Sequence, residues 1–171
     1  KLNTPVTSYS SVAHSFSTMD LKRQISKMGK IKRVIAYGPI DLESKYGGVF
    51  FYGPHLIEPL IYIFENKVNK VRVNKIDKTG SANMIFDDGM IVTIIFSKKN
   101  RGWQTFVEIE NGFVEVKSKI NKKIPGKNDI DMINMFRTGK EPREHSHILH
   151  GVAILEALEK SVISGEWEKV I

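Results

Sequence analysis

The chain has 171 residues, a formal net charge of +7 and no cysteine, which excludes disulfides and thiolate metal sites and makes the cytoplasm the expected compartment. Its length suits a single domain with one hydrophobic core. The most apolar stretch, residues 56–64, is too short to cross a bilayer and contains Glu58 and Pro59, so we expect no membrane association and no signal peptide.

The first forty residues predict an extended segment, a helix and a strand. Residues 5–16 are rich in Thr, Ser, Val and Tyr and alternate weakly, which favours an extended conformation. Residues 18–28 carry an apolar stripe between a capping box and a glycine, which predicts a helix. The residues concerned are Leu21, Ile25 and Met28 in the stripe, Ser17 and Asp20 in the box, and Gly29 at the end. Residues 31–37 predict a strand.

The middle of the chain predicts a second helix followed by several strands. Gly53 and Pro54 are typical of a helix start, and the apolar stripe that follows is Leu56, Leu60, Ile63 and Phe64. Alternation through residues 68–76 predicts a strand. Turn signals at residues 87–89 and 111–112 indicate three more strands within residues 82–117, arranged as an antiparallel meander.

Two helices are predicted to close the chain. The first covers about 129–138, with Asn128 as its cap, Ile133 and Phe136 facing inward, and Gly139 at its end. The second begins near Pro142 and ends before Gly165, with a buried stripe of Leu149, Val152, Leu155, Leu158 and Val162. The pattern predicts an α+β fold: an open, mixed, largely antiparallel sheet with helices on one face. Residues 91–96 are apolar on both faces, so the other face would expose a hydrophobic patch unless something covers it.

Chemistry is most strongly indicated by residues 47–58, which place His55 in the first turn of the second helix. The helix's positive pole disfavours an imidazolium, while Glu58, one turn later, favours one. A neutral imidazole held near this carboxylate can accept a proton. The plainer interpretation is a histidine that only caps or packs at a helix start. Glu58 is expected to orient His55 or to bond the backbone.

This run resembles the GGxxxDxGxHxxD pattern of the substrate half of the Gfo/Idh/MocA oxidoreductases. The matching positions are Gly47, Gly48, Gly53 and His55, with Glu58 in place of the last Asp and Phe51 in place of the first. Residues 28–39 (MGKIKRVIAYGP), residues 136–142 (FRTGKEP) and a long helix that ends at residues 159–167 (EKSVISGEW) extend the resemblance over nearly the whole chain. The family's GxGxxG turn and Glu-Lys-Pro segment do not occur in these residues.

The resemblance implies that residues 1–171 are one C-terminal-type domain without the nucleotide-binding domain. Such a domain binds substrate and oligomerises in an NAD- or NADP-dependent oxidoreductase that acts on a sugar, polyol or related hydroxyl compound, and is inactive alone. It implies a homodimer or homotetramer through the open sheet face. His55 is the implied catalytic residue, and the candidate substrate-binding residues are Lys45, Gly47, Gly48, Tyr52 and Glu58. Because Phe51 replaces the family's Asp, a ligand-binding or dimerisation module without redox activity stays open as an alternative.

Two other functions are weighed and not favoured. His145, His147 and His150 suggest a metal site, because His147 and His150 lie three apart on one helical face. His145 faces elsewhere and no cysteine or carboxylate completes the ligand set, so an exposed polar helix start is expected and no metal. Two groups of basic residues raise the possibility of nucleic acid as a partner. They are Lys22, Arg23, Lys27, Lys30, Lys32 and Arg33, and Lys98, Lys99 and Arg101. Because neither is interleaved with stacking aromatics, solvated lysine-rich faces are favoured and no nucleic-acid partner is expected.

Overall fold

A seven-stranded mixed sheet forms the centre of the molecule in the computed structural model, which describes residues 4–8, 10–97, 104–116 and 126–171. The strand order is β6-β5-β1-β4-β3-β2-β7, with β1 and β4 parallel and the other neighbours antiparallel. The strands are β1 (Arg33–Gly38), β2 (Val68–Ile76), β3 (Thr79–Phe86), β4 (Ile91–Phe96), β5 (Gln104–Ile109), β6 (Gly112–Val116) and β7 (Glu168–Lys169). The predicted α+β class is therefore confirmed.

The predicted meander over residues 82–117 is wrong, because β1 lies between β4 and β5. Val34 of β1 pairs with Val92 of β4 on one side and with Val107 of β5 on the other. Both predicted turns exist: β3 and β4 are joined at residues 87–90, and β5 and β6 at residues 110–111. Turn signals indicate only local pairing, whereas the parallel β1–β4 pair is a long-range contact: two helices and the strands β2 and β3 lie between β1 and β4 in the chain. Residue 117 lies outside the described residues.

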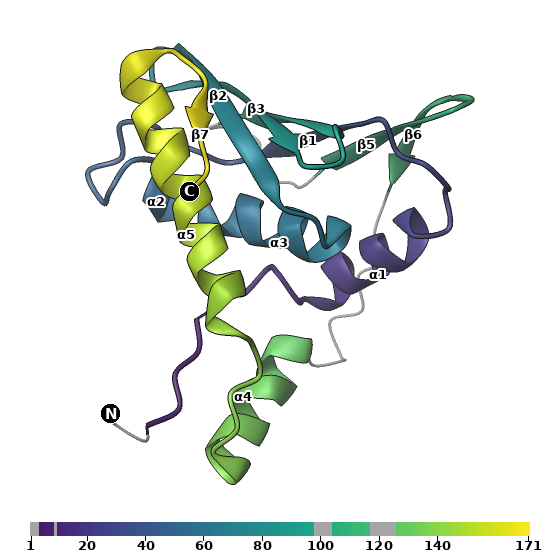
Figure 1. The fold of residues 1–171 in the computed structure, drawn as a ribbon, viewed down its shortest axis with the longest axis vertical. Helices are drawn as coiled ribbons and strands as arrows, with labels where there is room; N and C mark the ends of the chain where they lie inside the picture. Colours follow the sequence, from purple (N-terminus) through teal and green to yellow (C-terminus); the bar gives the residue numbers. More distant parts are fainter. Residues whose placement is uncertain (1–3, 9, 98–103, 117–125) are drawn as a thin grey trace.

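Helices cover one face of this sheet (Figure 1). They are α1 (Phe16–Ile25), α2 (Val49–Tyr52), α3 (Pro54–Phe64) and α5 (His145–Ser164), while α4 (Lys127–Thr138) lies farther from the sheet. The main core forms where α3 and α5 meet the strands, and Leu56, Leu158 and Val92 there are fully buried. Burial of each such side chain stabilises the fold by about 1.5–3 kcal/mol. A second cluster joins α1 and α3 to the other end of the sheet through Ile25, Ile63, Val107 and Val116.

The N-terminal segment differs from its prediction. The described part of residues 4–15 runs as irregular coil and turns rather than as a strand. Helix α1 begins at Phe16, two residues earlier than predicted, because Ser15 rather than Ser17 is its N-cap and its Oγ accepts the Thr18 N–H at 3.3 Å. The helix ends at Ile25, three residues before the predicted end, although Leu21 and Met28 still pack on the second cluster.

The two closing helices also differ in part from the prediction. Helix α4 begins after Gly126, and Asn128 lies inside it rather than capping it. Ile133 and Phe136, predicted to face inward, are 50% and 77% exposed, because α4 stands away from the sheet that would bury them (Figure 1). Helix α5 begins at His145 and buries the predicted Leu155 and Leu158. Leu149 and Val152, also predicted to be buried, are exposed on its first turns.

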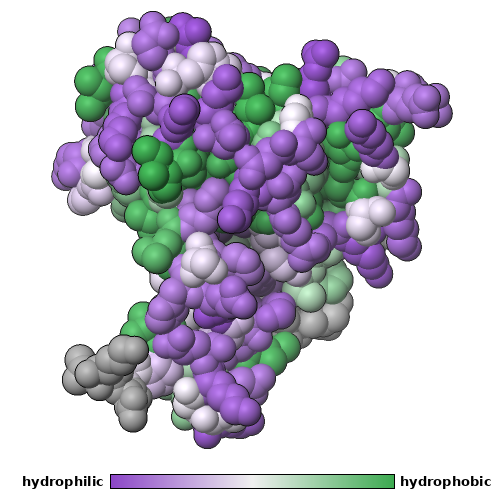
Figure 2. All heavy atoms as spheres, in the orientation of Figure 1, coloured by the Kyte–Doolittle hydropathy of each residue, from purple (hydrophilic) through white to green (hydrophobic). Residues whose placement is uncertain are grey.

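The surface reflects this arrangement. In Figure 2, apolar side chains gather on the upper part of the molecule, whereas the lower part that holds α4 is mostly hydrophilic with separate apolar spots. Within the described ranges, no helix combines the length and the hydrophobicity that a bilayer span requires.

Candidate functional site

The start of α3 forms a nearly continuous helix with α2. Gly53, between them, has helical dihedral angles (φ −53°, ψ −41°), and α3 begins at Pro54 as predicted. A Cβ at Gly53 would overlap the Val49 carbonyl oxygen and the Leu155 side chain, so only glycine allows α5 to approach this closely. Because the turns are continuous, residue 51 lies one turn before His55 on the same side of the helix.

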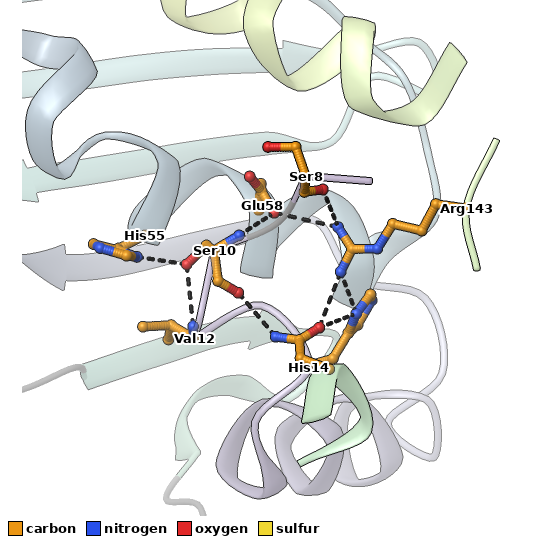
Figure 3. A network of polar contacts seen from close by, with 8 residues as sticks. Ser8, Ser10, Val12, His14, His55, Glu58 and Arg143 are labelled. Carbon is orange, nitrogen blue, oxygen red and sulfur yellow. Dashed lines mark hydrogen bonds and ion pairs between the residues drawn. The ribbon is translucent and has the colours of Figure 1, made fainter. Parts of the chain in front are cut away.

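His55 is held by the N-terminal segment. Its Nδ1 atom lies 2.6 Å from Oγ of Ser10, and Figure 3 shows the other ring nitrogen pointing away from the polar network. The Ser10 hydroxyl also accepts the Val12 N–H at 3.1 Å. The ring of Tyr52 lies 6.1 Å from the imidazole, centroid to centroid. The imidazole is therefore anchored at one nitrogen, and its second nitrogen points away from the protein groups that anchor the first.

Glu58 binds the same segment from the next turn of α3. Its Oε2 atom accepts the Ser10 N–H at 2.7 Å and lies 3.4 Å from Nη1 of Arg143. Arg143 also donates to the Ser8 carbonyl at 3.3 Å. Of the two roles expected for Glu58, the structure shows the backbone bond. The Arg143 guanidinium partly offsets the cost of holding this carboxylate away from water.

A third layer of the network joins α4 to the N-terminal segment. Asn128 donates its side-chain N–H to the Ser10 carbonyl at 2.9 Å, and its Oδ1 lies 2.8 Å from His14 Nδ1. Arg143 Nη2 contacts both His14 and Asn128. Burial, followed by the nearby Arg143 charge, lowers the pKa of His14 to about 4. His14 is therefore neutral at pH 7, with its ring packed edge-on against Tyr62.

Two hollows flank this network. The smaller, about 300 Å³, is lined by polar residues that include Ser10, His55 and Glu58. Its apolar lining residues include Phe51, Pro54, Ile148, Val152 and Leu155. The larger, about 1080 Å³, extends past His14 and Arg143 to the first turns of α5. Ser8, Glu58 and Ile148 line both, so part of the network forms the wall between them. His55 belongs to the smaller hollow, which we call the His55 cavity.

Four predicted substrate-binding residues are not among those that line the His55 cavity. Lys45 lies with its ammonium 4.9 Å from the Tyr46 ring centroid. Phe51 lines the His55 cavity and also contacts the loop that holds Lys45, because its ring centroid lies 5.0 Å from that of Tyr46. The ring centroid of Tyr52 lies 4.7 Å from that of Phe51. Gly47 and Gly48 close the turn before α2, with φ angles of 112° and 55°. A role in substrate binding stays a prediction for Lys45, Gly47, Gly48 and Tyr52.

The Gly47-Gly48 turn can be tested as a binding site for the phosphates of a dinucleotide. A phosphate cradle needs backbone N–H groups directed at the ligand at a helix start. Here the N–H groups of Gly47 and Gly48 both donate to the Ser44 carbonyl, at 3.1 and 2.9 Å. Helix α2, which follows, is only four residues long. This turn therefore offers neither N–H group to a dinucleotide phosphate.

Two histidines of α5, His145 and His150, have protein partners. His150 Nε2 accepts the Val68 N–H at 3.1 Å, and burial, followed by the charge of Lys67, lowers the pKa of His150. His145 pairs with Glu141 at 2.9 Å. In the part of the chain that the structure describes, no group of three His, Cys, Asp or Glu side chains is arranged to hold a metal ion.

The basic residues weighed for nucleic acid are described only in part. Lys22 pairs with Glu65, Arg23 with Asp20, and Arg33 with Glu108. The second group, Lys98, Lys99 and Arg101, lies outside the described residues.

Ser10, His14 and Arg143 were missed by the sequence analysis. Ser10 lies 45 residues from His55 in the chain, and Arg143 lies 85 residues from Glu58. A usable signal was the polar run of residues 7–15, which has too few apolar side chains for a core strand. Arg143 directly follows the FRTGKEP segment, so extending that motif by one residue would have included it.

Comparison with known proteins identifies the fold. No protein-family model matches the chain, and no curated sequence matches it significantly. Among solved structures, GenD2 from gentamicin A biosynthesis, in complex with NAD, is 14% identical with a TM-score of 0.71 over 94% of this chain and 62% of its own. Scyllo-inositol dehydrogenase from Lactobacillus casei, with bound NAD(H) and scyllo-inositol, is 14% identical with a TM-score of 0.68 over 90% and 61%.

A third similar structure is the myo-inositol dehydrogenase of Lactobacillus casei in complex with NAD(H) and myo-inositol. It is 10% identical, with a TM-score of 0.70 over 94% of this chain and 60% of its own. The chain thus spans about three fifths of the length of these dehydrogenases. The fold of this chain is therefore similar to that of part of these dehydrogenases, in agreement with the resemblance seen in the sequence.

Proposed function

We propose that this chain is the substrate-binding and oligomerising domain of an NAD- or NADP-dependent oxidoreductase that acts on a sugar, polyol or related hydroxyl compound. The observation that carries the proposal is the His55 cavity, in a fold shared with NAD-bound dehydrogenases of inositols. His55 is the residue proposed to contact the reacting oxygen of the substrate. The cofactor would be held by a part of the full-length protein outside these residues.

The walls of the cavity suit a polyol. A ring-shaped polyol has a ring of hydroxyl groups and two faces made largely of C–H groups. Among the residues that line the cavity, His55 and Glu58 offer polar atoms, while Phe51 and Val152 offer apolar surface. A volume of about 300 Å³ lies at the lower end of the range for small-molecule sites. Tyr52, next to Phe51, would extend the aromatic surface at the edge of the cavity.

The test is a redox assay on the full-length protein. Reduction of NAD and of NADP is followed by absorbance with a panel of inositols, sugars and linear polyols. The proposal predicts turnover with at least one member of the panel. A panel without turnover, on protein that still binds one of these compounds saturably, would overturn the redox assignment.

That second outcome describes the alternative function, a ligand-binding or dimerisation module that kept the fold and lost redox chemistry. The observation that favours it is Phe51, one turn before His55 on the wall of the same cavity, where the family pattern has an acidic residue. Under the alternative, the cavity binds ligand through His55 and its apolar wall, and no proton is transferred.

Oligomerisation is proposed to use the sheet face opposite α3 and α5. The side chains there alternate with the buried ones and are only partly exposed. The apolar members of this open face are Ile35 and Tyr37 of β1, Ile85 of β3, Ile91 and Ile95 of β4, and Phe106 of β5. The Tyr37 and Phe106 rings contact each other edge-on. A contiguous apolar face on a soluble domain favours association with a second copy.

A further inference from the structure

The hydrogen bonds of the Ser10 hydroxyl determine which nitrogen of His55 carries a proton. A serine hydroxyl has one proton to donate and two lone pairs to accept with. One lone pair accepts the Val12 N–H at 3.1 Å. Within the described residues, the remaining contact of Ser10 Oγ is His55 Nδ1, at 2.6 Å. Nδ1 is therefore the only acceptor described for the hydroxyl proton.

Because Ser10 is buried, its hydroxyl proton needs an acceptor within the protein. Ser10 is 3% exposed, so a hydroxyl proton without an acceptor would be left away from water, which is unfavourable. If Nδ1 of His55 carried the ring proton, the hydroxyl would accept from both Val12 and His55, and its own proton would lack a partner. We propose that Ser10 donates to Nδ1 and so holds neutral His55 as the Nε2–H tautomer, which makes Ser10 the positioning residue of the site.

The position of Ser10 is fixed independently of its side chain. Its N–H donates to Glu58 and its carbonyl accepts from Asn128, at 2.7 and 2.9 Å. Arg143 holds both of these partners, which extends the support to the loop before α5. Replacing the hydroxyl therefore leaves the backbone anchors in place, so the effect of the hydroxyl can be measured separately.

The Nε2–H tautomer defines what the cavity offers a ligand. The nitrogen that points away from the network carries a proton, so it donates a hydrogen bond to a carbonyl or hydroxyl oxygen and cannot accept a proton from it (Figure 3). For the substrate, this inference rests on the proposed function: His55 binds and orients the reacting oxygen as a hydrogen-bond donor. The proton released when a hydroxyl is oxidised then passes to solvent rather than to His55, the acceptor predicted from the sequence. The tautomer itself rests only on the Ser10 contact.

The test is ¹⁵N NMR of the protein labelled at its five histidines. Spectra are recorded at pH 9, above the ordinary titration range of histidine, with His55→Ala used for assignment. The proposal predicts a protonated Nε2 and an unprotonated Nδ1 for His55. Ser10→Ala should mix the two tautomers, and Ser10→Thr, which keeps a hydroxyl, should restore the wild-type pattern. Ser11→Ala, at an exposed neighbour, is the matched control and should change nothing.

A proton on Nδ1 in the wild-type protein would overturn the inference, and so would a Ser10→Ala spectrum with an unchanged His55 pattern. Neither result depends on catalysis, so the proposed function can stand if the tautomer fails. In the redox assay, Ser10→Ala should lower kcat/KM by about five- to thirtyfold, the effect of losing one or two kcal/mol of hydrogen bonding. If the predicted tautomer is found and the panel gives no turnover, the inference stands and the redox function fails.

Discussion

The hydroxyl of Ser10 lies 2.6 Å from Nδ1 of His55 and joins the N-terminal segment to the first turn of α3. One turn further along α3, Glu58 binds the backbone N–H of the same serine. The geometry of the candidate site therefore depends on how residues 4–15, which form no strand or helix in their described part before Phe16, dock on α3. Side chains from α4 and from the loop before α5 complete that docking.

Removing the Glu58 carboxylate should destabilise the protein. Glu58→Ala leaves the Ser10 N–H without its acceptor and Arg143 without its ion-pair partner in a largely buried network. We expect the free energy of unfolding to fall by about 1–3 kcal/mol, measured by urea denaturation.

The matched control is Glu156→Ala, which removes a carboxylate that pairs with Lys160 on the exposed side of α5. Exposed pairs of this kind contribute about 0.3–0.5 kcal/mol. Equal losses in the two variants would contradict a structural role for Glu58.

The free energy of unfolding should decrease as the pH is lowered, because His14 becomes protonated. Its pKa is about 4 in the folded protein and near 6.5 unfolded, so between these values the unfolded state binds more protons. The contribution of His14 is fully present above pH 6.5 and is lost progressively down to pH 4, by up to about 3 kcal/mol. Urea denaturation at pH 7, 6 and 5 measures this loss.

His14→Gln removes the titrating group and keeps a side chain that can bond Asn128 and Arg143. The difference in unfolding free energy between wild type and variant should therefore shrink as the pH falls from 7 to 5. A difference that does not change with pH would show that His14 is not held neutral by the fold.

Local patterns predicted most elements of the fold. Strand β2 has the bounds that alternation indicated, and α3 begins where Gly53 and Pro54 placed its start. The errors came from contacts far apart in sequence. Turn signals placed β4 next to β5, but the sheet inserts β1 between them. Apolar spacing predicted buried faces at Phe136 and Leu149, but a stripe indicates burial only where another element lies against it.

The candidate site was predictable only at its centre. A short motif identified His55 and Glu58, because helix geometry places them one turn apart. The partners of these two residues are Ser10 and Arg143, which are distant in the chain and belong to no periodic pattern. Asn128, which bonds the Ser10 carbonyl, is equally distant. Side-chain networks of this kind depend on tertiary docking, so propensity and spacing cannot indicate them.

Association through the open face should be abolished by a charge at its centre. Ile95 of β4 lies between Tyr37 and Ser81 in the register of the sheet. Ile95→Glu would bury a carboxylate in the proposed interface, so we expect a dimer or tetramer to become a monomer in sedimentation velocity.

Ile163→Glu, at a side chain of α5 that is 84% exposed, serves as the control and should leave the oligomer unchanged. A monomeric wild type at all accessible concentrations would contradict the proposed interface. An oligomer of unchanged size in Ile95→Glu would contradict it equally.

The most direct test of the account is the effect of His55→Ala on kcat/KM for the best substrate of the panel, in the full-length protein. The account places His55 on the reacting oxygen, and loss of such a donor costs about 10²–10³ in rate. His147→Ala, at an exposed histidine of α5, is the matched control. We predict a loss of that size for His55→Ala and none for the control. Equal kcat/KM values in wild type and His55→Ala would contradict the central claim that substrate binds at His55.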